Sequence, residues 1–220
     1  MRKLGIPALL SLNGGFVDTV SFLGLQGLFT AHVTGNFVTL AATLVSGTHG
    51  VIAKLLALPE FVVIIVVARL VGAALRARDL PALRLLLVAK VAFLLAFFAL
   101  AVAFGPFPNS DAPLALVTAF AGIAGMAIQN AVQRVHYGTM PPTTLMTGNT
   151  TQAALDAVDL LHGGGSDPAA TRARFGRTVT SIAWFAGGCA LGAALYYWIG
   201  FWSLAVPVAV GAATAILGKD

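Results

Sequence analysis

Few residues of this 220-residue chain are charged: Asp, Glu, Lys and Arg together make up 10% of it, whereas 58% of the residues are hydrophobic. Soluble domains have about 25% charged residues. A water-soluble fold of this length has too little interior to bury so many apolar side chains, and its surface would need polar cover. The composition therefore excludes a soluble domain. It indicates an integral membrane protein surrounded by the lipid bilayer, with room for about six to eight helical crossings.

Cysteine is scarce as well, because Cys189 is the only one. This excludes an intrachain disulfide and a cysteine metal cage, and we interpret Cys189 as a small buried apolar residue. The sequence also lacks a His-Glu-x-x-His motif, a P-loop, a Gly-x-Ser-x-Gly elbow and a cluster of metal-ligating residues. We therefore expect neither enzymatic activity nor a metal or other cofactor. The net charge of +5 comes from basic residues beside apolar segments, so we expect no nucleic-acid partner.

Eight apolar segments follow one another along the chain. They are 5–29, 33–46, 53–76, 83–104, 113–136, 145–161, 178–199 and 201–217. Polar stretches with Gly or Pro at 76–81, 105–111 and 163–168 separate several of them and predict loops. We expect an all-α transmembrane fold that forms a single integral membrane domain over residues 1–220.

Three landmarks recur in the same order in the two halves of the chain. Asp18 corresponds to Asn130, at an offset of 112 residues. Thr34-Gly35-Asn36 corresponds to Thr147-Gly148-Asn149 at an offset of 113, and residues 72–75 correspond to 192–195 at an offset of 120. Chance does not readily produce such a series, even in a biased composition. We therefore predict an internal repeat, with repeat one at about 5–104 and repeat two at about 113–217.

Basic residues concentrate at 2–3, 76–84, 172–177 and Lys219. If all eight segments crossed the membrane, these clusters would divide between its two sides, against the positive-inside rule. If segments one and two make one net crossing, and segments five and six another, every cluster and both termini become cytoplasmic. The count is then six net crossings, three in each half. An odd number makes the repeats inverted, an architecture common among secondary transporters.

Each Thr-Gly-Asn motif then lies at membrane depth, at a helix break or re-entrant tip. Non-helical backbone survives there only when it is buried in protein or lines a wet cavity. Thr can cap the next helix, Gly permits unusual dihedrals, and Asn offers a donor and an acceptor. The helix ends would favour an anion. Candidate substrate-binding residues are therefore Thr34, Gly35, Asn36, Thr147, Gly148 and Asn149. Alternatively, the motifs only allow close helix packing, as we expect of Gly188 and Gly192.

Polar and charged side chains inside the segments form the second group of candidates. A charge at bilayer depth costs about 3 kcal/mol and should find a partner. We expect Asp18 to pair with Arg134 across the repeats, either as a structural tie or as a proton- or ligand-coupled switch. Arg69 could line the same cavity or pair structurally. Gln129 and Asn130 add polar groups to segment five and join the candidate substrate-binding residues.

Histidine is rare among these segments, and His32 precedes the first Thr-Gly-Asn motif by two residues. It could titrate near neutral pH. We nevertheless interpret it as a histidine whose polar atoms are satisfied in the interior or at the interface.

Four stretches are similar to a known family. They are 15–18, 32–36, 129–131 with Arg134, and 145–149. In these residues the chain resembles the YoaK-like family of bacterial inner-membrane proteins, which is grouped as a domain of unknown function. The resemblance covers nearly the whole chain and implies a multi-pass protein of the bacterial inner membrane, without an established activity.

Two functions are compatible with these observations. The first is a small secondary transporter or channel for an anionic or zwitterionic solute, with Asp18 as the candidate for proton coupling. The alternative is a non-transporting membrane scaffold or partner subunit, in which the same residues hold the halves together. Six crossings enclose little space, which favours a homo-oligomer.

Overall fold

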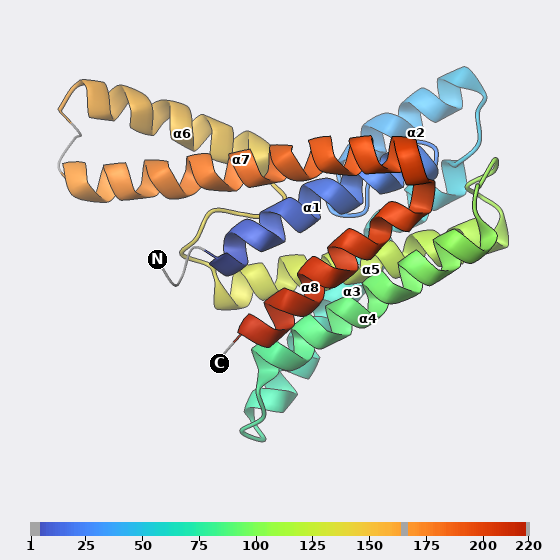
Figure 1. Cartoon of the computed structure of the whole chain (residues 1–220), viewed down its shortest axis with the longest axis horizontal. Coiled ribbons are helices and arrows are strands. Elements are labelled where there is room, and N and C mark those ends of the chain that lie inside the picture. Colours follow the sequence, from blue (N-terminus) through green and yellow to red (C-terminus); the bar gives the residue numbers. More distant parts are fainter. Residues whose placement is uncertain (1–4, 164–166, 219–220) are drawn as a thin grey trace.

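A computed structural model describes residues 5–163 and 167–218, and all regular structure in them is helical (Figure 1). The elements are α1 (Gly5–Gly24), α2 (Gly35–Ser46), α3 (Val51–Arg76), α4 (Ala82–Phe104), α5 (Pro113–His136), α6 (Met146–Leu161), α7 (Pro168–Ile199), the 3-10 helix η1 (Gly200–Leu204) and α8 (Ala205–Leu217). The prediction of an all-α fold is therefore confirmed. The predicted basic positions 2–3 and Lys219 lie outside the described residues.

Several of these helices are long and apolar enough to cross a membrane: α1, α3, α4, α5 and the continuous stretch from α7 to α8. Their outer surfaces are apolar too. On α3, Val62, Val63 and Leu70 are 50%, 58% and 65% exposed. Exposed aliphatic side chains in this number suit contact with acyl chains and are costly in water. The composition and the surface together agree with an integral membrane protein.

The two most buried spans, α1 and α5, form the centre of the molecule. Helix α7 lies along α1, and α3 and α4 pack against α5 (Figure 1). Gly188 allows the close approach of α7 to α1, because a Cβ atom at this position would overlap the carbonyl oxygen of Leu12. This agrees with the packing role expected for Gly188.

Two predicted boundaries were wrong. Helix α1 ends at Gly24 rather than near residue 29, because Gln26 and Gly27 adopt positive φ angles of 55° and 81°. Helix α7 begins at Pro168, ten residues before the predicted apolar segment. The side chain of Asp167 accepts a hydrogen bond from the amide of Ala170 at 3.0 Å, and proline suits the first helical position.

Helices α2 and α6 contain 12 and 16 residues. At 1.5 Å per residue they measure about 18 and 24 Å, less than the hydrocarbon thickness of about 30 Å. Helix α2 packs against α3, and α6 packs against α7. Each follows a non-helical segment, 25–34 before α2 and 137–145 before α6. The Thr-Gly-Asn motifs therefore lie where two short helices begin.

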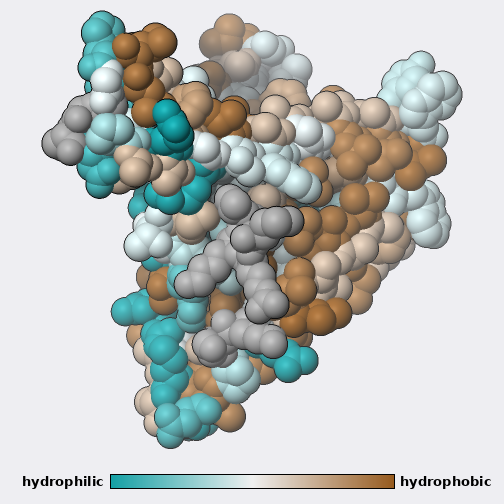
Figure 2. Space-filling model, turned by 60° about the vertical axis from the view of Figure 1, so that its left-hand side comes forward, coloured by the Kyte–Doolittle hydropathy of each residue, from teal (hydrophilic) through white to brown (hydrophobic). Residues whose placement is uncertain are grey.

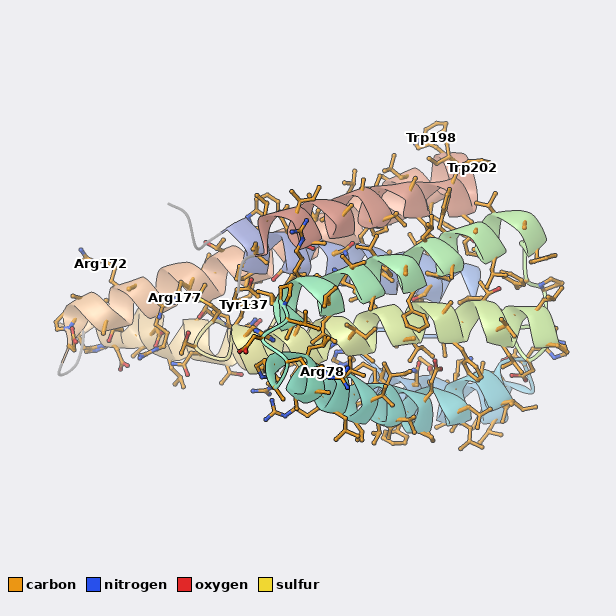
Figure 3. All side chains as sticks on the ribbon, turned by 90° about the horizontal axis from the view of Figure 1, so that it is seen from below. Arg78, Tyr137, Arg172, Arg177, Trp198 and Trp202 are labelled. Atoms are coloured by element: carbon orange, nitrogen blue, oxygen red, sulfur yellow. The ribbon has the colours of Figure 1, made fainter. Side chains whose placement is uncertain are left out.

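The two ends of the bundle differ in character. Arg78 and Tyr137 lie at one end, and Arg172 and Arg177 lie on the α6–α7 pair that projects beyond it, whereas Trp198 and Trp202 lie at the opposite end (Figure 3). Figure 2 shows the same division, with hydrophilic surface gathered at the tip of α6–α7 and at the turn between α3 and α4. Helix α7, with 32 residues, measures about 48 Å, longer than a bilayer core requires.

Candidate functional site

Asp18 holds the non-helical segment 25–34 against α1. Its Oδ1 accepts hydrogen bonds from the amides of Thr30 and Ala31 at 2.8 and 2.6 Å and from the Thr30 hydroxyl at 3.2 Å. Its Oδ2 accepts from the amide of His32 at 2.9 Å. The side chain is buried. One carboxylate thus supplies partners for three successive backbone amides that would otherwise be unpaired inside the protein.

Asn36 fastens the same segment from the other side. Its Oδ1 accepts from the amide of Phe29 and its Nδ2 donates to the Phe29 carbonyl, both at 2.8 Å. Gly35 leaves room for this turn, since a Cβ atom there would lie 2.9 Å from His32 Cδ2 and 3.0 Å from Phe29 Cδ2. The predicted cap by the Thr34 hydroxyl is wrong, because that side chain makes no capping hydrogen bond.

Segment 137–145 is fastened by corresponding residues. Asn149 Nδ2 donates to the carbonyl of Pro142 at 2.8 Å, again seven residues back along the chain. The Thr144 hydroxyl donates to Asn130 Oδ1 at 2.7 Å, so Asn130 holds its segment through one side chain, whereas Asp18 holds the first through three backbone amides. Leu145 rather than Thr147 occupies the position before α6, and it makes no side-chain cap.

The predicted ion pair between Asp18 and Arg134 is not formed. Both carboxylate oxygens of Asp18 face donors of residues 30–32, so the folded-back segment occupies the place expected for Arg134. Arg134 lies in the last turn of α5, and its side chain is exposed. Among the described residues, the one salt bridge joins Arg174 and Asp156. Backbone amides satisfy Asp18 without burial of a second charged side chain.

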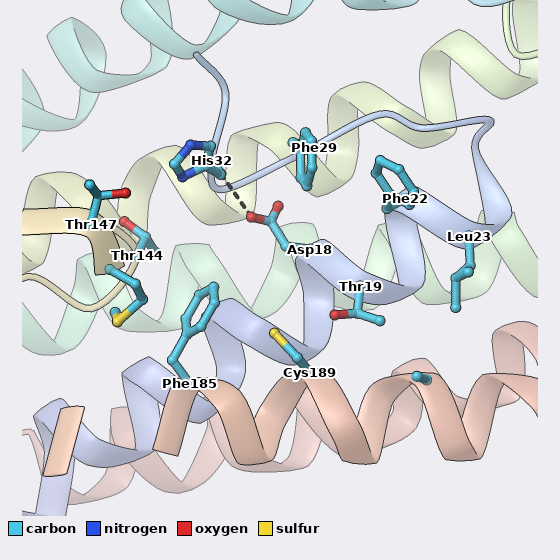
Figure 4. A pocket seen from close by; sticks show the side chains of 12 residues that line it. Asp18, Thr19, Phe22, Leu23, Phe29, His32, Thr144, Thr147, Phe185 and Cys189 are labelled. Carbon is cyan, nitrogen blue, oxygen red and sulfur yellow. Dashed lines mark hydrogen bonds between the residues drawn. The ribbon is translucent and has the colours of Figure 1, made fainter. Parts of the chain in front are cut away.

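The first of three cavities, the Phe185 cavity, lies between α1, segment 25–34, the start of α6 and α7, and has a volume of about 500 Å³. Figure 4 shows Phe185 and Cys189 facing it from α7, with His32 and Phe29 on the other side. Thr147 of the second motif also lines it. Cys189 is half-buried and borders this cavity rather than filling the core.

The Arg69 cavity lies on the other side of residues 31–34, between them, α3 and α5, and has a volume of about 320 Å³. Four predicted site residues meet in it: Thr34, Arg69, Asn130 and Arg134. Leucine, phenylalanine, isoleucine, valine and alanine side chains and His32 complete the described lining, which contains no acidic residue. Positive charge in an apolar setting makes this cavity suitable for an anion.

Asp18 also lines the Phe185 cavity, whereas five other predicted residues lie apart from these two linings. Gly35 and Asn36 shape segment 25–34, while Gly148 and Asn149 border a third cavity beside α7. Gln129 is fully buried; its Nε2 donates to the Leu10 carbonyl at 2.8 Å, and its Oε1 has no hydrogen-bond partner in the described structure.

The position of His32 between the two cavities was not predicted. This residue lines both the Phe185 cavity and the Arg69 cavity, and its amide is one of the groups that Asp18 binds. Its place two residues before the first Thr-Gly-Asn motif was the available signal. His32 therefore stands between the two cavities at the folded-back segment.

A known protein family matches nearly the whole chain. Residues 6–217 match the family model described as "Protein of unknown function (DUF1275)". Neither a curated protein nor a solved structure matches the chain.

Proposed function

The chain belongs to the DUF1275 family, which is the family of the YoaK-like proteins, and we propose that it is a small secondary transporter for an anionic or zwitterionic solute. The solute would bind in the Arg69 cavity. The observation that carries this proposal is the pairing of Arg69 and Arg134 in one apolar cavity whose described lining contains no acidic residue.

Neither arginine has an acidic partner among the described residues, although Arg69 lies within the span of α3 and Arg134 in the last turn of α5. Arg69 lies seven residues before the end of α3, about 10 Å along the helix. Neither Arg69 nor Arg134 forms a salt bridge with a described residue. A charge in this setting is costly unless it is paired, and a guanidinium binds a carboxylate or phosphate through two parallel hydrogen bonds. A bound anion would supply the missing partner, with Asn130 and Thr34 providing neutral polar contacts.

We further propose that the halves are inverted repeats with six net crossings, three in each half, in the bacterial inner membrane. Support comes from the short helices α2 and α6, which extend from the centre towards opposite ends of the molecule (Figure 1). Arg78, Arg172 and Arg177 lie at or beyond the same end of the bundle (Figure 3). In this arrangement that end faces the cytoplasm.

Segments 25–34 and 137–145 are the proposed moving parts. Each is held by a few polar contacts rather than by a regular helix, and each leads into a short helix packed on one neighbour. Protonation of Asp18 would replace an acceptor with a hydroxyl donor and loosen residues 30–32. Because His32 and Thr34 line the Arg69 cavity, such loosening would open or close it. This would couple proton binding to access.

The scaffold alternative keeps one specific observation in its favour. Asn36 and Asn149 are buried and bonded to their own segments, so their side chains are occupied structurally. In that function Arg69 and Arg134 would bind groups of a partner protein or lipid rather than a transported solute.

A thermal-shift screen of the purified protein in detergent tests the proposal. We expect one class among monocarboxylates, dicarboxylates and amino acids to raise the melting temperature of the native protein, and the same compound to enter proteoliposomes. Arg69→Gln should lose both effects. Arg78→Gln is the matched control, because this exposed residue lies in the α3–α4 turn. A solute that stabilises Arg69→Gln as well as the native protein, or the absence of any uptake, would contradict the proposal.

A further inference from the structure

A third cavity, the Arg177 cavity, lies where α6 and α7 leave the bundle. It has a volume of about 460 Å³ and is bordered by the end of α5, residues 139–142, the start of α6 and one face of α7. Its lining is more polar than that of the other two cavities. The residues that carry the argument are Arg134, Gly148, Asn149, Arg174 and Arg177.

Positive charge accumulates in this cavity, and the acidic residues near it act on Arg174 alone. Arg134, Arg174 and Arg177 all line it, and no acidic residue appears in the described lining. Asp156 neutralises one of them from outside: Arg174 donates from Nε to both carboxylate oxygens at 3.0 Å and from Nη2 to Oδ1 at 2.6 Å. The charge of Asp159 also acts on Arg174, whereas Arg134 and Arg177 form no salt bridge with a described residue. The Arg174 Nη1 group takes no part in these bonds.

Arg177 provides an independent observation. Its Nε atom is buried and has no hydrogen-bond partner among the described atoms. A buried guanidinium N–H group is costly when no acceptor faces it, so such groups are nearly always satisfied by protein, water or ligand. An oxyanion in the cavity would provide the acceptor.

The start of α6 adds amide donors to the same wall. Gly148 and Asn149 belong to its first turn, and no side chain caps this helix end. The first amides of a helix have no partners inside the helix and carry a partial positive charge. A Cβ atom on Gly148 would meet no atom within 4 Å, so the backbone here borders open space.

We infer that the Arg177 cavity is a binding site for a phosphate group. The guanidinium groups of Arg134 and Arg177, which have no acidic partner among the described residues, suit a tetrahedral anion whose oxygens can be shared among guanidinium groups and helix amides. The phosphate could belong to a free ion or to a lipid headgroup, since this cavity lies at the basic end of the bundle, where Arg177 is seen in Figure 3. Arg134 lines both the Arg177 cavity and the Arg69 cavity. Arg174 and Arg177 line only the former and Arg69 lines only the latter, so variants of these residues test the two sites separately.

Isothermal titration of inorganic phosphate into the purified full-length chain tests the free-ion source, at constant ionic strength with chloride as the competing anion. We expect Arg177→Gln to weaken phosphate binding about tenfold or more, which corresponds to one lost charge-assisted contact of about 1.4 kcal/mol. Arg69→Gln should bind phosphate as the native protein does. Arg172→Gln, which changes an exposed arginine of the same helix, is the matched control.

A second variant guards against misfolding. Arg177→Lys keeps the charge but loses the Nε donor and the planar fork, so it should fold like the native chain and still bind phosphate less tightly. Equal phosphate binding by the native protein, Arg177→Lys and Arg177→Gln would overturn the proposal.

Native mass spectrometry tests the lipid source, using protein from nanodiscs of phosphatidylcholine with and without phosphatidic acid. The occupant would be a lipid headgroup if the native protein retains phosphatidic acid and this lipid blocks phosphate binding. Arg177→Gln should then lose the lipid. Binding of neither phosphate nor phosphatidic acid would overturn the proposal. If Arg69→Gln abolishes solute uptake while phosphate binding persists, the two sites are separate. Loss of phosphate binding alone would leave the transport proposal standing.

Discussion

Asn36 and Asn149 make the same hydrogen bond in two distant parts of the chain. Each donates from Nδ2 to the backbone carbonyl seven residues before it, Phe29 in one case and Pro142 in the other, at 2.8 Å. Each therefore closes a non-helical segment at the start of a short helix. The Thr-Gly-Asn motifs matter structurally because their asparagines fasten backbone that would otherwise be unpaired.

Replacing these asparagines should destabilise the protein unequally. Asn36→Ala removes two partly buried hydrogen bonds and leaves both backbone groups of Phe29 without this partner, which we expect to cost about 2–4 kcal/mol. Asn149→Ala removes the bond to Pro142 and should cost about 1–2 kcal/mol. Thermal unfolding in detergent measures both. Thr150→Ala, an exposed change on α6, serves as the control. A larger loss in Asn149→Ala than in Asn36→Ala would contradict this account.

The carboxylate of Asp18 should be more important for local order than for overall folding. Asp18→Ala removes every acceptor for the amides of residues 30–32, whereas Asp18→Asn keeps one oxygen and places an NH2 group among donors. We expect amide hydrogen exchange at Thr30, Ala31 and His32 to rise in both variants, by more in Asp18→Ala, with smaller changes in α4. Unchanged protection of these three amides would show that Asp18 does not hold the segment.

Close packing of α7 on α1 predicts a difference between neighbouring glycines. Gly188→Ala places a methyl group against the Leu12 carbonyl and should cost about 1–3 kcal/mol through separation of the helices. Gly187→Ala meets no atom within 4 Å and should be neutral or slightly stabilising, since alanine favours helix. The midpoints of thermal or denaturant unfolding compare the two. Equal midpoints would refute the close contact.

The contact between Asp156 and Arg174 predicts an acid-sensitive component of stability. Hydrogen bonds from Arg174 lower the pKa of the Asp156 carboxyl below its ordinary value of 3.8. Because the folded pKa lies below the unfolded one, the contribution is complete at neutral pH and is lost as the pH falls through the folded pKa. Between about pH 6 and about pH 3, the native protein should therefore lose more thermal stability than Asp156→Asn does. Asp79→Asn, which changes an exposed residue of the α3–α4 turn, should follow the native curve.

Much of the helical framework was predictable because long apolar runs leave little choice in a bilayer. The predicted segments 83–104 and 113–136 agree with α4 and α5 within one residue. The start of α7 was missed for a physical reason: residues 168–177 carry Arg172 and Arg174 and extend beyond the apolar stretch. Hydropathy detects the part of a helix that is embedded in lipid, and it therefore does not detect a polar extension of the same helix beyond the membrane.

The candidate site was harder to predict than the helices. Thr34, Arg69, Asn130 and Arg134 were all predicted as candidates, and they line one cavity. The partner of Asp18 was not, because hydrogen bonding to backbone amides depends on how a loop folds back and leaves no pattern of side chains in the sequence. The carboxylate of Asp18 in an apolar helix suggested Arg134 as its partner, whereas the backbone amides of residues 30–32 bind it instead.

Pro142 has a consequence for the relative strength of the two fastened segments. Phe29 offers Asn36 both an amide and a carbonyl, but proline has no N–H group, so Asn149 can hold its segment through the carbonyl alone. The two asparagines therefore hold their segments with different numbers of hydrogen bonds to the residue seven positions back. We expect segment 137–145, beside the arginine-rich end, to detach before segment 25–34, so that the two segments are not equivalent in the resting protein.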